Sequence, residues 1–174
     1  MFVELIAPSA EHKQAAWDYR QEYFDRGEEW IHGSGGLARA EDYESWLENT
    51  KNSRIFAPPG FVKCSTYFAF DGGRIVGTIQ IRHELNDKLL LSGGHIGYGV
   101  RPLERRKGYA SRMLAIALEK CRELGIEKAL VTCDKNNTGS AKTAMKNGGV
   151  LENEITEENG TIIQRYWIPV KKGE

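Results

Sequence analysis

The segment best suited to bind a ligand is a basic turn directly before a long amphipathic helix. The turn consists of Arg105, Arg106 and Lys107, and Gly108 follows them. A helix N-terminus has about four backbone N–H groups without intrahelical partners and roughly half a unit of positive charge, so it attracts anions. Gly108 lets a ligand approach the backbone closely, and Ala110 keeps the next turn small. These features predict a site for a diphosphate.

Two common nucleotide-binding motifs do not occur in the sequence. It contains neither G-x-x-x-x-G-K-[ST] nor G-x-G-x-x-G, which argues against ATP and dinucleotides as ligands. The plain alternative is that a strand, a solvated basic turn and a helix only pack together.

The elements that must position this turn alternate between strands and helices. Asp71-Gly72-Gly73 and Glu158-Asn159-Gly160 each predict a hairpin, because glycine supplies the positive φ that such turns need. The helix after the basic turn has apolar residues at the i, i+3, i+4 and i+7 positions, and Gly125 ends it. Periodicity predicts strands over 3–6, 65–70, 74–82, 95–100, 128–133, 150–156 and 161–170, and helices over 10–26, 41–49, 110–124 and 138–147.

This order makes the centre of the chain a βαβ unit with hairpins on its flanks. We therefore expect an α/β fold, with a mixed, mostly antiparallel sheet and helices on both faces. The glycine-rich stretch 27–38 is predicted to be a mobile loop rather than a buried element. The length of 174 residues predicts a single domain over 1–174.

Composition excludes several classes of protein. The longest aliphatic run is Leu89-Leu90-Leu91, far below the roughly 18 residues of a membrane span, and the N-terminus lacks a secretory signal, so we expect a cytoplasmic protein. Three cysteines without C-x-x-C spacing argue against a disulfide framework and a zinc site. The net charge of zero argues against a nucleic-acid partner.

Charge is unevenly distributed along the chain. Residues 1–50 hold eleven acidic and four basic residues, whereas residues 101–112 hold five basic residues and one acidic residue. If both stretches border one cleft, one end attracts anions and the other cations.

The basic turn resembles the acyl-CoA signature of the GNAT superfamily of N-acetyltransferases. Arg105-x-x-Gly108-x-Ala110 matches [QR]-x-x-G-x-[GA], and it lies between a V-x-P strand end, Val100-Arg101-Pro102, and a long helix. The order of elements resembles the family over nearly the whole chain. The run 93–98 is similar to that of a bacterial group of predicted acetyltransferases with unknown acceptors.

The resemblance implies that acetyl-CoA, without a metal, lies where the strand ending at Val100 splays from the strand ending near Cys133. The pantetheine arm would pair with the backbone of 99–101, a main-chain N–H near Val100 would polarise the thioester carbonyl, and the pyrophosphate would lie on the amides of 106–110. Asn137-x-x-Ser140 also resembles the family's N-x-x-[AS] helix start. The implied cofactor-binding residues are Gly99, Val100, Arg101, Arg105, Arg106, Lys107, Gly108, Tyr109, Ala110, Ser111, Asn137 and Ser140.

The sequence departs from the family at the position of its usual general acid. Many relatives have a tyrosine seven residues after the asparagine, and here that residue is Ala144. The acid must come from elsewhere, with Tyr98 and Tyr109 as candidates, or the thiolate leaves unassisted.

An attacking amine must be neutral, so a base is needed, directly or through water. The candidates at strand ends are His95, His83 and Glu84. Histidine titrates near neutrality, but one at a strand end can equally be a hydrogen-bonded structural residue.

The leading interpretation is transfer of an acetyl group to a primary amine of a small molecule or peptide by direct attack in a ternary complex. One alternative is a catalytically silent acyl-CoA sensor, and another is an enzyme that acts on nucleotide phosphates. Glu28, Glu29 and Trp30 in the glycine-rich loop suit a cationic acceptor. Relatives are often dimers, so a homodimer is a further expectation.

Overall fold

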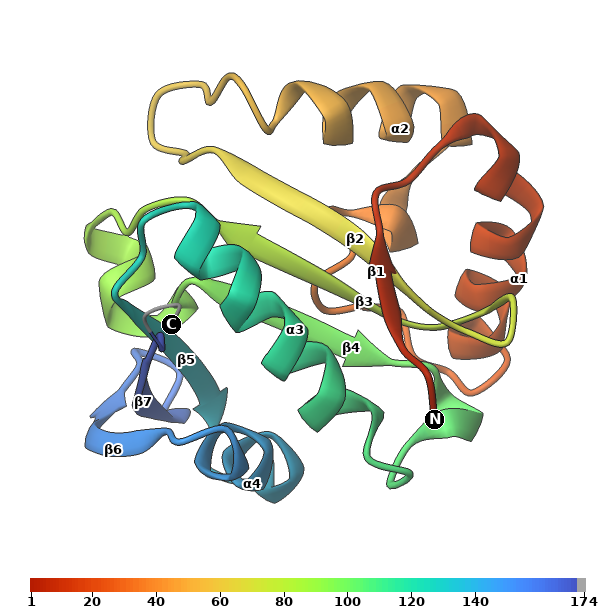
Figure 1. The fold of residues 1–174 in the computed structure, drawn as a ribbon. Coiled ribbons are helices and arrows are strands. Elements are labelled where there is room, and N and C mark those ends of the chain that lie inside the picture. The colour runs from red at the N-terminus through yellow and green to blue at the C-terminus, as the bar shows by residue number, and fades with distance from the viewer. Residues whose placement is uncertain (172–174) are drawn as a thin grey trace.

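The strands form two separate antiparallel sheets in the computed structural model, which describes residues 1–171. The four-stranded sheet has the order β1 (Glu4–Ile6), β2 (Cys64–Asp71), β3 (Arg74–Arg82) and β4 (Ile96–Val100). The three-stranded sheet has the order β5 (Lys128–Asp134), β7 (Ile162–Pro169) and β6 (Val150–Thr156). The chain passes from β4 to β5 through the longest helix, so the point where the two sheets meet lies in the middle of the predicted βαβ unit (Figure 1).

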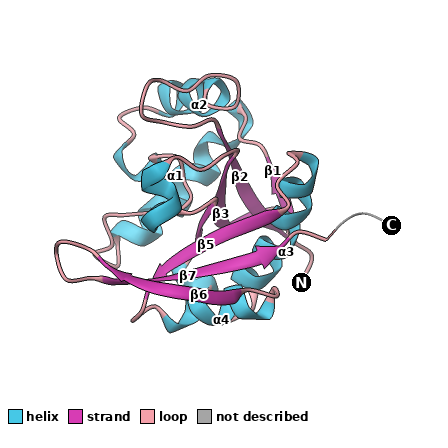
Figure 2. Cartoon of the chain, turned by 90° about the vertical axis from the view of Figure 1, so that its left-hand side faces the viewer, coloured by secondary structure: helices cyan, strands magenta, loops and turns pink. Residues whose placement is uncertain are grey.

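Four α-helices cover the two faces of these sheets. α1 (Lys13–Phe24) and α2 (Tyr43–Asn52) lie on one side of the strands, and α3 (Tyr109–Glu123) and α4 (Thr138–Lys146) lie on the other (Figure 2). A core around Tyr19, Trp46 and Phe68 packs under α1 and α2. A larger core joins both sheets to α3, which buries the apolar stripe that its sequence predicts, including Met113 and Leu114. The expected α/β fold with helices on both faces is confirmed.

The glycine-rich loop 27–38 differs from its prediction, because it is packed against the protein. Ile31, Ser34 and Leu37 are buried, and a Cβ atom on Gly33 would collide with the carbonyl oxygen of Gly97 in β4. The prediction that this stretch is not a buried element is therefore wrong. Its glycines permit close contact with a strand.

Two local differences concern helices. The first expected helix begins as a 3-10 turn, Ala10–His12, before α1 starts at Lys13. The connection between β3 and β4 contains a short π-helix, Leu89–Gly93, that periodicity did not predict. Among residues 1–171, no helix is both long and apolar enough to cross a membrane.

Candidate active site

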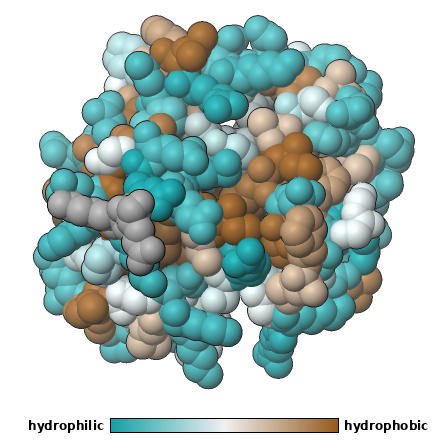
Figure 3. Space-filling view, viewed as in Figure 1, coloured by the Kyte–Doolittle hydropathy of each residue, from teal (hydrophilic) through white to brown (hydrophobic). Residues whose placement is uncertain are grey.

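A gap separates β4 from β5, and it is closed at one end by a pair of hydrogen bonds. The backbone N–H of His95 donates to the carbonyl of Leu130 over 2.7 Å, and the N–H of Leu130 donates to Nδ1 of His95 over 2.9 Å. β4 and β5 then diverge toward their C-terminal ends (Figure 1), and they form no ladder in the described part of the chain. On the surface, an indentation lies between the region of α4 and the loop before α3 (Figure 3).

The backbone of β4 presents hydrogen-bonding groups to this gap. The N–H of Arg101 donates to the Val76 carbonyl over 2.8 Å, and the N–H of Arg82 donates to the His95 carbonyl over 2.7 Å. Because successive residues of an antiparallel strand direct these groups to alternate edges, Gly99 and Arg101 face β3, whereas Val100 faces the gap. Of the backbone groups expected to meet pantetheine, the Val100 N–H is therefore the accessible donor.

The carbonyl at the same position is already engaged. The hydroxyl of Tyr23 in α1 donates to the Val100 carbonyl over 2.8 Å, and Nε of Arg105 donates to it over 3.2 Å. These bonds attach the end of β4 to α1 and to the basic turn. They hold the Val100 N–H in place beside the gap.

The start of α3 has the open geometry that the sequence predicts for anion binding. Gly108 is the N-cap, with a φ of 91° that favours glycine. Within residues 1–171, the backbone N–H groups of 106–111 have no hydrogen-bond partner. Arg106 is exposed and has no ion pair among those residues. The unpartnered amides and the N-terminal end of the helix dipole fit a diphosphate.

The other basic side chains of this region are paired with carboxylates. Arg105 forms a two-point contact with Glu28, at 2.7 and 2.8 Å, and this contact is the main cause of a lowered pKa at Glu28. Nε of Arg101 lies 2.7 Å from Glu22, and Nζ of Lys107 lies 2.8 Å from Glu104. Positive charge for an anion therefore comes from the backbone, the helix dipole and Arg106 rather than from these three side chains.

The remaining expected cofactor residues contact other elements. Tyr109 donates its hydroxyl to Asp71, and the Ser111 hydroxyl accepts from Asn147. Asn137 caps α4 by accepting from the Ser140 N–H over 3.1 Å.

Tyr98 bridges β4 and α4. Its hydroxyl lies 2.8 Å from Oγ of Ser140, and burial raises the pKa of the phenol to about 12. Tyr98 and Ser140 thus form a contact between the two elements that adjoin the gap.

The three candidate bases lie at the closed end of the gap. β3 is antiparallel to β4, so His83 and Glu84, which follow β3, lie near the start of β4. Nε2 of His83 lies 2.8 Å from the Ser65 hydroxyl. His95 is buried, and desolvation, with a smaller contribution from Arg82, lowers its pKa to about 4. The structure brings these residues together, but away from the Val100 N–H.

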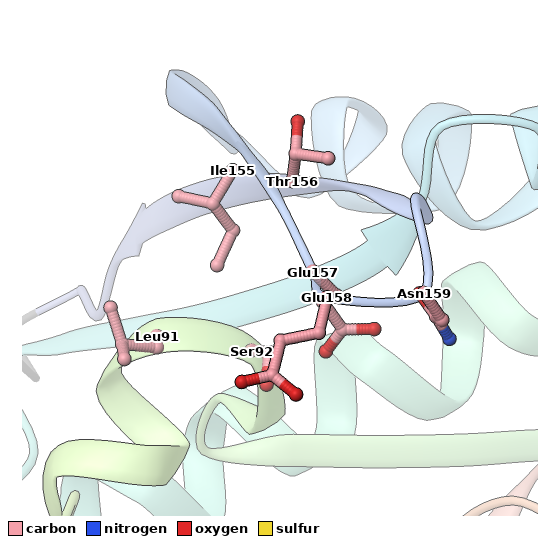
Figure 4. A pocket seen from close by; sticks show the side chains of 7 residues that line it. All are labelled: Leu91, Ser92, Ile155, Thr156, Glu157, Glu158 and Asn159. Atoms are coloured by element: carbon pink, nitrogen blue, oxygen red, sulfur yellow. The ribbon is translucent and has the colours of Figure 1, made fainter.

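Two surface hollows border loops near the sheets. One, of about 520 Å³, lies between the Leu89–Gly93 helix and the β6–β7 hairpin, where Glu157 and Glu158 face Leu91 and Ser92 across the hollow, with one of the two carboxylates beside Ser92 (Figure 4). The other, of about 630 Å³, lies at the α1–α2 loop, where the guanidinium of Arg39 is 4.8 Å from the Trp30 ring centroid. Its lining residues are Phe24, Gly27, Glu29, Trp30, Ala38 and Arg39.

A polar network joins α1, β3 and the 27–38 loop, and no sequence pattern predicts it. Thr78 donates its hydroxyl to the His32 carbonyl over 3.0 Å and lies 3.2 Å from the Tyr19 hydroxyl. No spacing rule links these residues, because they come from a loop, a strand and a helix that are distant in sequence. The sequence signal nearest to His32 is the acidic pair Glu28 and Glu29 in the same loop.

Comparison with known families decides what kind of protein has this site. The sequence model of the acetyltransferase (GNAT) family matches residues 17–148, which is most of the chain. The chain belongs to the GNAT family of acetyltransferases. It is therefore an acyltransferase, and acetyl-CoA is its donor substrate. No curated protein sequence matches the chain.

Solved structures share the fold at low sequence identity. RimL, a ribosomal L7/L12 alpha-N-protein acetyltransferase in complex with coenzyme A, is 16% identical over 97% of this chain and 94% of its own, with a TM-score of 0.70. MccE, a microcin C7 self immunity acetyltransferase in complex with acetyl-CoA and AMP, is 14% identical over 97% and 92%, with a TM-score of 0.68. Spermidine N-acetyltransferase SpeG from Vibrio cholerae is 16% identical over 97% and 95%, with a TM-score of 0.61.

Proposed function

We propose that this GNAT acetyltransferase transfers the acetyl group of acetyl-CoA to a primary amine by direct attack in a ternary complex. The observation that carries the proposal is the combination of unpartnered amides at 106–111 with a Val100 N–H that faces the gap. The relatives of the same fold include an alpha-N-protein acetyltransferase and a spermidine N-acetyltransferase, which supports an amine as the acceptor.

The backbone has the main binding role in this proposal. The amides of 106–111, with Arg106, bind the pyrophosphate, and the Val100 N–H donates to the thioester oxygen as negative charge develops on it. Removing a donor of this kind typically reduces kcat by about 10² to 10³. Arg101, Arg105 and Lys107 position the turn through their carboxylate partners.

Tyr98 is assigned a positioning role. Burial raises the pKa of the Tyr98 phenol to about 12, so this phenol is a poor proton donor to a departing alkyl thiolate. The thiolate therefore leaves without a proton from Tyr98, and the Tyr98–Ser140 contact holds β4 against α4.

The acceptor is an amine, and the preference of the site for a charged or neutral amine depends on which carboxylates of the protein are free of ion pairs. Glu28 is paired with Arg105, so it supports a cationic acceptor less than its sequence position suggests. Glu29 and the hairpin residues Glu157 and Glu158 border the two hollows. A small cationic amine or a peptide amine is the expected acceptor class, and a homodimer and a cytoplasmic location stay predictions.

The direct test combines calorimetry with a thiol-release assay. The protein is titrated with CoA, then incubated with acetyl-CoA and a panel of neutral, cationic and peptide amines. We expect CoA binding and amine-dependent release of free thiol, with acetylated amine detected by mass spectrometry. Binding without thiol release for any amine would instead favour the silent sensor, and stronger thermal stabilisation by ATP than by CoA would favour a nucleotide site.

A further inference from the structure

The four histidines of the chain differ in what their ring nitrogens contact. Nδ1 of His12 accepts from the Ser9 N–H, Nε2 of His83 is bonded to Ser65, and Nδ1 of His95 accepts from the Leu130 N–H. In contrast, the ring of His32 has no hydrogen-bond partner within residues 1–171, and the residue is exposed. Of the four, His32 has both ring nitrogens available.

The backbone of His32 lies over Gly99, near the open end of β4. A Cβ atom on Gly99 would lie 2.9 Å from the His32 carbonyl oxygen and 3.5 Å from its backbone nitrogen. The hydroxyl of Thr78 fixes that carbonyl from the neighbouring strand, and Gly33 packs on Gly97. The backbone of His32 thus contacts the residue that precedes Val100, on the face of the sheet covered by α1 and α2.

The surroundings of the ring favour its neutral form. The Trp30 ring lies edge-on to the His32 ring, with centroids 6.2 Å apart, and the Arg39 guanidinium lies 4.8 Å from the Trp30 ring centroid. Arg82 of β3 is the charged group that acts on the imidazole, and Tyr19 and Tyr23 are the titratable groups of α1 on this face. His32 is exposed overall, but partial desolvation of its ring first and Arg82 second lower its pKa below the ordinary value of 6.5, so the ring is neutral and can accept a proton at pH 7.

We propose that His32 is the general base of the acetyl transfer, an inference that rests on the proposed function. The amine nitrogen attacks the thioester carbon, and a C–N bond forms while the carbonyl π electrons move to oxygen. His32 takes the proton that the nitrogen loses, directly or through one water, and later releases it to solvent. The oxyanion then re-forms the carbonyl as the C–S bond breaks, and the electron pair of that bond leaves with the CoA thiolate, which takes a proton from solvent. In this assignment the acceptor lies beside the Trp30 ring, on the α1–α2 side of β4.

The test compares His32→Gln and His32→Ala with His12→Gln, whose histidine lies at the start of α1 with its Nδ1 engaged by Ser9. With an amine that the wild type acetylates, both His32 variants should lose about 10² to 10⁴ in kcat, which is the usual contribution of a general base. The acidic limb of the wild-type kcat profile should disappear in both, and added imidazole should restore part of the activity of His32→Ala. The CoA affinity and melting temperature of these variants should match those of the wild type, and His12→Gln should keep wild-type kcat.

The outcomes separate this inference from the function on which it rests. If the wild type releases thiol and His32→Gln retains its kcat and its pH profile, the base is another group and the inference is wrong. If His32→Gln loses kcat but keeps the acidic limb, His32 only positions the acceptor, which also contradicts the proposal. If the wild type acetylates no amine, the proposed function fails first, and the assignment of His32 fails with it.

Discussion

The two ends of the five-residue strand β4 differ in whether their hydrogen-bonding groups have partners. At its start, His95 and Leu130 form two hydrogen bonds with each other, and these bonds hold the two sheets together. At its end, the Val100 N–H and the nearby start of α3 leave backbone donors without partners. The side chains with the most obvious chemistry lie at the closed end, where structural contacts engage them. Backbone groups and glycine provide the binding capacity at the open end.

Residues of the acidic and basic stretches are likewise paired with one another. Glu22 and Glu28 come from the acid-rich first third of the chain, and Arg101 and Arg105 come from the basic segment. They neutralise one another across the junction of α1 with β4. The expectation of a cleft with two oppositely charged ends therefore does not hold for these residues.

The sharpest test of the open end is Gly108→Glu. A carboxylate about 4 Å from a phosphate costs about 4 kcal/mol at an effective dielectric of about 20, so CoA affinity should fall about 1,000-fold by calorimetry. Gly125→Glu is the matched control, because Gly125 has a φ of 76° at the other end of α3 with open space around it. It introduces similar backbone strain and should leave CoA affinity unchanged. Equal CoA affinity for both variants would show that the pyrophosphate does not bind at the start of α3.

The closed end should make stability depend on pH. The native pKa of His95 is about 4, below the ordinary 6.5, so between these values the unfolded chain binds a proton that the native protein does not. The free energy of unfolding should therefore decrease as pH falls from 6.5 to 4, by up to about 3 kcal/mol from this residue. Urea unfolding of the wild type and His95→Asn across this range isolates the effect. A difference between the two that is constant with pH would contradict it.

Removing the closing hydrogen bond should affect stability and not catalysis. His95→Ala leaves the Leu130 N–H buried without an acceptor, which costs about 2 kcal/mol of unfolding free energy at pH 7. His95→Asn offers an oxygen near the position of Nδ1 and should recover much of this loss. Both variants should keep the wild-type pH profile of kcat. If the folded variants instead lost about 10² or more in kcat relative to the wild type, His95 would be the general base.

The smallest expected effect concerns the Arg105–Glu28 pair. Its side chains are 42% and 36% exposed, so solvent screens their attraction. A double-mutant cycle with Glu28→Gln and Arg105→Gln should give a coupling of about 0.5 kcal/mol in unfolding free energy, and it should shrink in about 1 M salt. A coupling above about 2 kcal/mol would contradict this expectation and show that the pair contributes strongly to the stability of the β4 end.

Much of the fold could be predicted because it is encoded locally. The apolar stripe of α3, the hairpin glycines and the alternation in β3 produced element boundaries within a few residues of those observed. The π-helix at Leu89–Gly93 has no comparable signal, and the packing of loop 27–38 depends on a strand more than fifty residues away. Glycine content alone cannot distinguish a mobile loop from one that needs close contact.

The sequence by itself determined the family, the helix start that suits an anion and the missing tyrosine at Ala144, because motif spacing and helix periodicity depend on neighbouring residues. The sequence places His95 at the start of β4, but only the tertiary structure decided that His83 lies at the same end. His83 follows β3 and Val100 ends β4. Because antiparallel neighbours end at opposite edges of a sheet, these two residues lie far apart. The same folding brought His32, from a distant loop, onto Gly99 and paired the charges of the basic turn.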